Sequence, residues 1–341
     1  MILTMLKIDG AFGEGGGQIL RSSVALSALT GKDIEIVNIR SKRTRSGLAA
    51  QHLTAVRGVA ELCSASLKGD ELGSTSLKFS PREVLGGEYE FNVGTAGSVT
   101  LVLQACMLAA LHADGPVTMT IKGGTNVRMS PPVDHYQNVL LPLLEKMHVD
   151  VDLEILHRGF YPQGGGSVTA TFMPPRAVMP LKILERGHPR GITATSFVQN
   201  LPEHIAQRME HAVRKSLLGE SITANRQFSS GSSSGAGIYL SAKFDNTILG
   251  ADALGERGIP AERVGEDAAE RIKDELEGDG TLDVHTADQL LPYMALATGP
   301  SSFKVRELSS HLTTQIWLLP QFLPVEIELD GPTITVVPNH T

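Results

Sequence analysis

One order of predicted elements occurs twice between residues 5 and 172, and this repeat constrains the fold more than any other feature. The first copy has strands at 5–9, 32–39, 64–68 and 76–79, with helices at 19–29 and 48–63. The second copy has strands at 89–93, 117–121, 150–156 and 166–172, with helices at 98–111 and 136–147. A period of about eighty residues predicts duplicated β-α-β-α-β-β units rather than one continuous dinucleotide-binding sheet.

A third copy of the unit is also predicted. Its first strand is at 181–184, and an insertion separates this strand from the rest of the copy. The copy resumes with a helix at 287–297, a strand at 302–308, a helix from His311 and strands at 325–329 and 333–337. The insertion has strands at 192–198, 222–227 and 238–244, helices at 203–218 and 261–277, and a Ser/Gly-rich run at 229–237 that predicts a flexible turn. We therefore predict an α+β fold. Residues 1–185 and 281–341 form a large domain of three repeats, and residues 186–280 form a smaller inserted α+β domain.

Composition narrows the class of protein. The chain of 341 residues is 41% apolar and 20% charged, as in ordinary globular proteins, and no apolar run is long enough to span a bilayer. Cys63 and Cys106 lie in apolar helical patterns, so two buried free thiols are expected, and zinc-ligand spacings are absent. We expect a soluble cytoplasmic protein with no obligate protein partner. Its net charge of −7 favours local rather than indiscriminate contact with nucleic acid.

His311 is the candidate for chemistry. It follows Ser309 and Ser310, either of which can cap the apolar helix that begins there. The positive potential of a helix N-terminus favours a neutral imidazole and welcomes phosphate. A neutral imidazole beside a phosphate chain can attack phosphorus. The alternative is a capped surface histidine without a chemical role.

A glycine-rich turn, Gly13 to Gly17, precedes the first helix. It lacks the Gly-Lys-Ser/Thr of a phosphate-binding P-loop and the third glycine of the dinucleotide fingerprint. It can still present backbone N–H groups to an anion. Glu14 is a carboxylate among these glycines, which suggests a divalent cation between it and phosphate oxygens. Charge complementarity to the helix start explains it equally well.

Several other polar residues can be explained either by a structural role or by binding a ligand. The first unit holds a basic group that is either a solvated loop or a dock for phosphate: Arg21, Arg40, Lys42, Arg43 and Arg45. Gln51 and Gln104 lie in apolar helices and need a ligand or a neighbouring helix as partner. Asp288 and Gln289 head a predicted helix, where Asp288 stabilises the helix start or the pair holds a nucleotide. His204 and His211 are predicted surface residues.

Taken together, these residues strongly resemble the RNA 3′-terminal phosphate cyclase family. The resemblance extends from Asp9 to the final strands. It is carried by the segments Asp9-Gly10, Gly13 to Arg21, Asn38-Ile39-Arg40, Gly47-Leu48, Gln51-His52, Gly94 to Ser98, Gln104, Gly123-Gly124-Thr125, Asp288-Gln289 and Ser309 to Leu312. It implies the three-repeat fold with an insertion. It also implies an enzyme that uses ATP to convert an RNA 3′-phosphate into a 2′,3′-cyclic phosphodiester, through a histidine–AMP adduct and an RNA adenylate, with release of pyrophosphate and AMP.

The resemblance also assigns roles. His311 matches the catalytic histidine, and Glu14 matches the ligand of a divalent cation, Mg²⁺ or Mn²⁺. Residues matched to binding phosphates of ATP or of the RNA end are Arg21, Arg40, Arg43 and Gln51. Residues matched to the ATP pocket are Gln104, Pro131, Asp288 and Gln289. His285 stands where relatives are expected to stack a tyrosine on adenine, and an imidazole can stack as well.

Two other functions compete with the cyclase. Some cyclase-like proteins are noncatalytic RNA-binding factors of ribosome assembly, but they lack the histidine that is present here as His311. An enolpyruvyl transferase built from related repeats needs phosphate-binding lysines and arginines in several units. Here the basic residues concentrate in the first unit. The sequence therefore favours the enzyme.

Overall fold

The computed structural model describes residues 5–339 and contains four mixed sheets. Three of them have the same topology. In order along the sheet they read β1-β2-β4-β3, β5-β6-β8-β7 and β9-β14-β16-β15. In each, the first pair is parallel and the other two pairs are antiparallel. This confirms the predicted α+β fold of three repeats.

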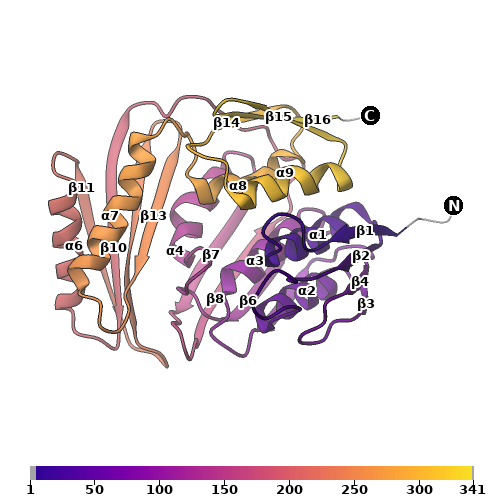
Figure 1. Ribbon diagram of the computed structural model, residues 1–341, viewed down its shortest axis with the longest axis horizontal. Coiled ribbons are helices and arrows are strands. Elements are labelled where there is room, and N and C mark those ends of the chain that lie inside the picture. Colours follow the sequence, from indigo (N-terminus) through magenta and orange to yellow (C-terminus); the bar gives the residue numbers. More distant parts are fainter. Residues whose placement is uncertain (1–4, 340–341) are drawn as a thin grey trace.

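The first unit packs around one fully surrounded helix. Its elements are β1 (Leu6–Asp9), α1 (Gly17–Thr30), β2 (Ile34–Val37), α2 (Ala50–Leu62), β3 (Ser66–Lys68) and β4 (Leu77–Ser80). Residues 18–29 of α1 are all buried. Helices α2, α3 and α9 contact α1, and a helix buried on every side belongs to the core of the molecule. The start of α1 therefore lies where the three units meet (Figure 1).

The second unit repeats the arrangement with one irregular helix. Its elements are β5 (Gly87–Asn92), α3 (Val99–Ala110), β6 (Val117–Gly123), α4 (Val133–His135), α5 (Leu141–Glu145), β7 (Asp150–His157) and β8 (Gly166–Met173). A single helix was predicted at 136–147. Instead α4 continues through a π-helical turn at Tyr136–Leu140 into α5. Pro142 lies in the first turn of α5, where its missing N–H interrupts the regular hydrogen bonds.

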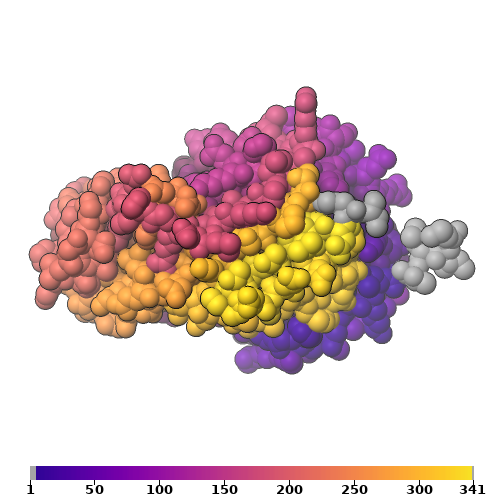
Figure 2. Space-filling view, turned by 90° about the horizontal axis from the view of Figure 1, so that it is seen from above, coloured from indigo at the N-terminus to yellow at the C-terminus, as the bar shows by residue number. Residues whose placement is uncertain are grey.

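The third unit is divided in the sequence, with its first strand before the inserted module and its other elements after it. Its elements are β9 (Lys182–Ile183), α8 (Val284–Met294), β14 (Ser301–Lys304), α9 (Ser310–Phe322), β15 (Val325–Asp330) and β16 (Thr333–Pro338). The predicted strand 302–308 was too long, because the chain turns after β14 and Arg306 reaches Glu275 on the inserted module. Figure 2 shows this unit in yellow between the inserted module and the indigo first unit.

The inserted module, residues 186–280, is a four-stranded sheet covered by two helices. Its elements are β10 (Pro189–Gln199), α6 (His204–Ser216), β11 (Ile222–Ser229), β12 (Gly235–Phe244), β13 (Ile248–Leu254) and α7 (Ala261–Glu277). Strand β13 was missed in the sequence. The run 229–237 joins β11 to β12; residues 229–232 are exposed, but Ser233 fixes it to the second unit. Ser233 within it is 2% exposed, accepts from the Phe160 N–H and donates to the Gly164 carbonyl.

Two clusters of buried apolar side chains support the predicted division into domains. One runs through the three repeats and also takes in Phe197, Tyr239 and Ile248 of the inserted module. The other lies between the inserted sheet and α6 and α7. The chain enters and leaves the module at one place, because Arg186 donates to the carbonyls of Glu275, Leu276 and Gly280. Residues 186–280 as a separate domain remain a prediction.

Candidate active site

His311 lies at the start of α9, as predicted. Ser309 is the cap residue, and its hydroxyl accepts the Leu312 N–H at 3.0 Å. The imidazole points to the start of α1, where its Nδ1 lies 2.8 Å from Gln18 Oε1. Its Nε2 faces the glycine-rich turn and lies 3.5 Å from Glu14 Oε1. The side chain is 43% exposed, so one ring nitrogen is held inside the protein and the other is open to a ligand.

The surroundings keep this imidazole neutral. Desolvation lowers the pKa of His311, and the positive charges of Arg21 and Arg43 act in the same direction against the carboxylate of Glu14. A neutral imidazole has a lone pair on one nitrogen, which nucleophilic attack requires. The prediction that the site favours the neutral ring is therefore supported by the residues around it.

The glycine-rich turn rests on the first turns of α9. Phe12 stacks on Trp317, with ring centroids 3.9 Å apart and ring planes 9° apart. Gly13 has φ = +56°, and a Cβ there would lie 3.0 Å from Thr314 Oγ1. Glu14 accepts a hydrogen bond from the Ser310 hydroxyl at 3.4 Å and pairs with Arg43 at 2.8 Å. The turn thus brings a carboxylate beside His311.

Glu14 fits a cation site that is completed by substrate. Among residues 5–339, no three His, Cys, Asp or Glu side chains gather as a metal-binding group. Mg²⁺ is commonly held by one or two carboxylates together with phosphate oxygens and water. One carboxylate beside a phosphate site matches that pattern. It does not match a dedicated cage built from protein ligands alone.

The first unit supplies the positive charge, as the sequence suggested. Arg21 is buried, and burial lowers its pKa to about 10, so that it remains charged at neutral pH. Arg43 pairs with Glu14, and Arg40 donates to the Gly47 carbonyl at 2.8 Å. Lys42 donates to the Gly13 carbonyl at 2.8 Å. Most of the predicted basic group thus surrounds the glycine-rich turn rather than projecting from an isolated solvated loop.

The first turn of α1 is open to an anion. Gly16 caps this helix without a side chain, so its first backbone N–H groups are available. Gly17 must be a glycine, because a Cβ there would lie 2.1 Å from His52 Nε2 and 2.9 Å from Arg21 Nη1. The homologous helix α3 is capped by the hydroxyl of Ser98. The first unit thus combines an open helix start with a buried arginine, the features that its predicted role in binding phosphate requires.

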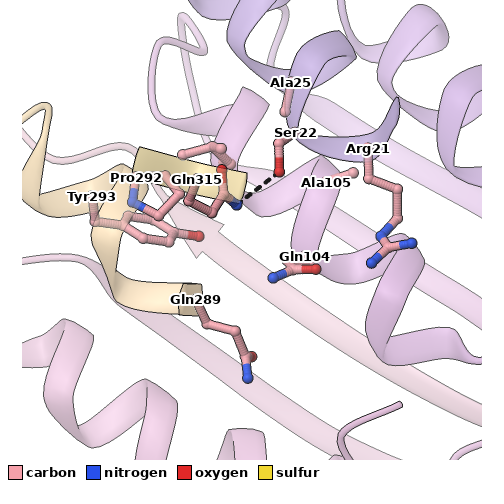
Figure 3. A pocket seen from close by; sticks show the side chains of 10 residues that line it. Arg21, Ser22, Ala25, Gln104, Ala105, Gln289, Pro292, Tyr293 and Gln315 are labelled. Atoms are coloured by element: carbon pink, nitrogen blue, oxygen red, sulfur yellow. Dashed lines mark hydrogen bonds between the residues drawn. The ribbon is translucent and has the colours of Figure 1, made fainter. Parts of the chain in front are cut away.

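The residues predicted to line an ATP pocket lie in three separate places. Gln104 and Gln289 line a cavity of about 10 Å³ together with Arg21 (Figure 3), which is room for about one water rather than a base. Pro131 lies in another segment, where its carbonyl accepts the Thr100 hydroxyl. His285 is exposed near the start of α8. Their roles toward ATP remain predictions.

Of two expectations about polar helix residues, one is wrong and one is confirmed. Asp288 does not head its helix, because α8 begins at Val284 and Asp283 caps it. Asp288 instead accepts from Gln18 Nε2 at 3.0 Å, and burial raises the pKa of Asp288 to about 8 despite the charge of Arg21. Gln51, in contrast, has the neighbouring helix as its partner, as one of its two interpretations predicted: its Oε1 accepts the N–H of Ser98, the cap residue of α3, at 3.1 Å.

No role was predicted for Gln18 and His52, although both belong to the motifs that carry the family resemblance. Gln18 joins His311 to Asp288. His52 is 5% exposed beneath Gly17, and its Nδ1 accepts the Ala49 N–H. A glutamine in the first turn of an apolar helix was a usable signal, since a buried amide needs partners. The partner 293 residues away had no local signal.

Several simpler expectations are confirmed. Cys63 and Cys106 are buried free thiols, and His204 and His211 are exposed on α6. Over residues 5–339, no helix combines the length and the apolar character needed to cross a membrane.

Comparisons with known proteins identify the family of the chain. A sequence model of the family described as "RNA 3'-terminal phosphate cyclase" matches residues 12–329. The chain is 46% identical over 340 residues to the RNA 3′-terminal phosphate cyclase of Methanopyrus kandleri, covering 96% of both chains. It is also 46% identical over 329 residues to that of Nitrosospira multiformis, covering 95% of this chain and 93% of the relative. The chain therefore belongs to the RNA 3′-terminal phosphate cyclase family.

A solved structure of the enolpyruvyl transferase NikO from Streptomyces tendae was also matched. It covers 98% of this chain and 83% of its own, at 11% identity and a TM-score of 0.27. A likeness this slight carries no argument about fold or function.

Proposed function

We propose that this protein is an RNA 3′-terminal phosphate cyclase that uses ATP and a divalent cation, with His311 as the nucleophile. The observation that carries the proposal is the arrangement of His311. Its Nδ1 is bonded to Gln18, and its Nε2 is open beside Glu14 and close to an uncapped helix start. The 46% identity to curated relatives of that name supports the substrate class.

The first step transfers AMP to the protein. The Nε2 lone pair attacks the α-phosphorus of ATP, an N–P bond forms, and the bond to the pyrophosphate oxygen breaks. In this proposal, phosphate oxygens are held by the first N–H groups of α1 and by Arg21, Arg40 and Arg43, a role supported by their positive charge. Glu14 is the residue that would hold the cation, which supplies charge neutralisation on the phosphates.

The next two steps form the cyclic end. An oxygen of the RNA 3′-phosphate attacks the phosphorus of the adduct, and the N–P bond breaks with its electron pair returning to Nε2. The neighbouring 2′-OH then attacks the activated 3′-phosphorus, loses its proton, and displaces AMP. Because the 2′-OH belongs to the same ribose, the last step depends mainly on positioning. The phosphate monoester needs AMP as a leaving group before it becomes a useful electrophile.

The test is formation of a labelled adduct without RNA. The wild-type protein is incubated with α-³²P-ATP and Mg²⁺ or Mn²⁺, and we expect a labelled, acid-labile and base-stable band on a denaturing gel. His311→Ala should abolish the band because it removes the nucleophile. The matched control is His211→Ala, which removes an exposed histidine on α6 and should leave the band unchanged.

Addition of RNA then tests the substrate. RNA with a 3′-phosphate should discharge the label, while the same RNA with a 3′-hydroxyl should not. A full-strength band in His311→Ala would rule out this nucleophile. A folded wild-type protein that forms no band but binds RNA would favour a noncatalytic RNA-binding factor.

A further inference from the structure

His311 is joined to the interior by a chain of two buried side chains. Its Nδ1 lies 2.8 Å from Gln18 Oε1, and Gln18 Nε2 lies 3.0 Å from Asp288 Oδ2. Gln18 is 4% exposed and Asp288 is 8% exposed. They come from the first turn of α1 and the middle of α8, so the chain crosses the meeting point of two repeats. Nothing in the proposed chemistry requires Gln18 to touch the nucleotide.

The two ends of the Gln18 amide are different, and this gives the chain a direction. Its nitrogen can only donate and its oxygen can only accept. Asp288 Oδ2 accepts from the amide nitrogen both when the carboxyl is ionised and when its proton is on Oδ1. The amide oxygen therefore faces His311 and requires a proton on Nδ1. In a neutral imidazole the lone pair is then on Nε2.

We propose that Gln18, held by Asp288, is a positioning residue that fixes the reactive tautomer of His311. This inference rests on the proposed function. With the proton on Nδ1, the Nε2 lone pair forms the bond to the α-phosphorus and the electron pair of the broken P–O bond leaves with pyrophosphate. The ring keeps its Nδ1 proton and becomes cationic, and the Gln18 oxygen accepts from it throughout. When the adenylyl group leaves, the electron pair returns to Nε2 without any proton transfer.

The opposite orientation of the amide would have the opposite effect. Its NH₂ group would donate to Nδ1, the ring proton would be on Nε2, and the nitrogen beside Glu14 would have no lone pair. In that tautomer the open nitrogen cannot attack phosphorus. The hydrogen-bonded chain from Asp288 through Gln18 to His311, called the relay below, thus requires the imidazole proton to lie on Nδ1. This requirement can be tested without measuring activity.

Gln315 supplies a matched control. It is 1% exposed and also joins α9 to α1, through its Nε2 and the Ser22 hydroxyl at 2.8 Å (Figure 3). It lies one helical turn beyond His311, and its bond to Ser22 lies outside the chain from Asp288 to His311. Gln18→Met and Gln315→Met each remove one buried amide between the same two helices, but only the first interrupts the relay.

The decisive experiment reads the tautomer directly. The protein is labelled with ¹⁵N-histidine, and long-range ¹H–¹⁵N correlation spectra are recorded without ATP, with His311→Ala used to assign the signals of His311. We expect the Nδ1–H form in the wild type and in Gln315→Met, and a shift toward the Nε2–H form in Gln18→Met. A wild-type His311 that carries its proton on Nε2 would overturn the relay, whatever the variants do.

Kinetics supply the second readout. Gln18→Met should lower the maximal rate of adduct formation by about 10- to 100-fold, by analogy with the loss seen when a partner that orients a metal-binding histidine is removed. The KM for ATP should stay near the wild-type value, and Gln315→Met should keep both. An unchanged rate in folded Gln18→Met would contradict the relay. If even the wild type forms no adduct, the proposed function fails, while the spectra still decide the tautomer.

Discussion

His311 and His135 stand at the start of the second helix in two copies of the repeat, yet their surroundings differ. His135 is 4% exposed, and both its ring nitrogens have protein partners: Nδ1 lies 3.0 Å from the Tyr239 hydroxyl and Nε2 lies 3.2 Å from that of Thr286. His311 has one nitrogen bonded to Gln18 and the other open beside Glu14. Desolvation lowers the pKa of both rings.

The first unit has its own histidine at the corresponding place. His52 is the third residue of α2, is 5% exposed and lies beneath Gly17. All three units therefore carry a histidine whose pKa is lowered by burial. What distinguishes His311 is an open ring nitrogen that faces the glycine-rich turn and Glu14. A buried histidine with a lowered pKa is therefore not enough to mark the candidate nucleophile, because His52 and His135 share both properties. Access of a ligand to one ring nitrogen is what sets His311 apart.

Among the changes that test this comparison, the largest effect on adduct formation is expected from a substitution that displaces the buried ring of His52. In Gly17→Ala, the new Cβ would overlap His52 Nε2, so the buried ring or the start of α1 must move. A displacement of about 1 Å near a reacting centre can cost about 100-fold in rate, and we expect a loss of that order in adduct formation. Single-turnover labelling with α-³²P-ATP measures it.

Gly31→Ala is the control at the other end of α1. Gly31 has φ = +68°, and among residues 5–339 no atom lies within 4 Å of a Cβ built there. Its backbone conformation disfavours alanine by about 1 kcal/mol, while the adduct should form at the wild-type rate. Equal rates in both variants would show that the position of His52 does not matter to the site.

An intermediate effect is expected at His135. His135→Leu keeps an apolar side chain in the core but leaves the Tyr239 hydroxyl without its bond to the ring. A buried hydroxyl without a partner costs about 1–3 kcal/mol, so we expect the free energy of unfolding in urea to fall by that amount. Adduct formation per folded molecule should not change. Loss of the adduct in folded His135→Leu would break the distinction between the two histidines.

The last effect, which is small when it is measured per pH unit, is a pH dependence of folding stability. Burial lowers the pKa of His52 from 6.5 to about 3, with Arg21 and Arg40 adding to the shift. Between these pH values the unfolded chain binds more protons than the folded one. Folding stability must therefore fall as pH falls from 6.5 toward 3, by at most about 1.4 kcal/mol per pH unit. His52→Gln should flatten this slope in urea titrations at pH 7, 5 and 4. Identical slopes would mean that His52 takes up its proton in the folded protein.

Much of the fold could be predicted because local sequence signals mark most of the strands, helices and turns of each repeat. Alternating strands, apolar helices and glycine turns recur at about eighty residues, and α7 falls at its predicted bounds. Strand β13 escaped because its seven residues include Gly250 and Asp252 and lack clear alternation. It is a strand because it pairs along β12. That pairing is tertiary, and the local sequence does not contain it.

The site was predictable to the same extent. His311 could be found from its cap, Ser309, and from its place before an apolar helix. Glu14 and the arginines could be found because they are unusual among glycines and in a chain of net negative charge. The bond between Gln18 and Asp288 joins residues 270 positions apart. Only the packing of α9 against both α1 and α8 brings Gln18, Asp288 and His311 together.

The stack of Phe12 on Trp317 gives the protein a built-in optical probe. Trp317 is the one tryptophan of the chain, and its ring lies against the turn that carries Glu14. Its emission therefore comes from a single known position, next to the proposed nucleotide site. Any movement of the turn when a nucleotide binds changes the surroundings of that indole. Occupancy of the site can then be followed by the intrinsic fluorescence of Trp317, without label, gel or RNA.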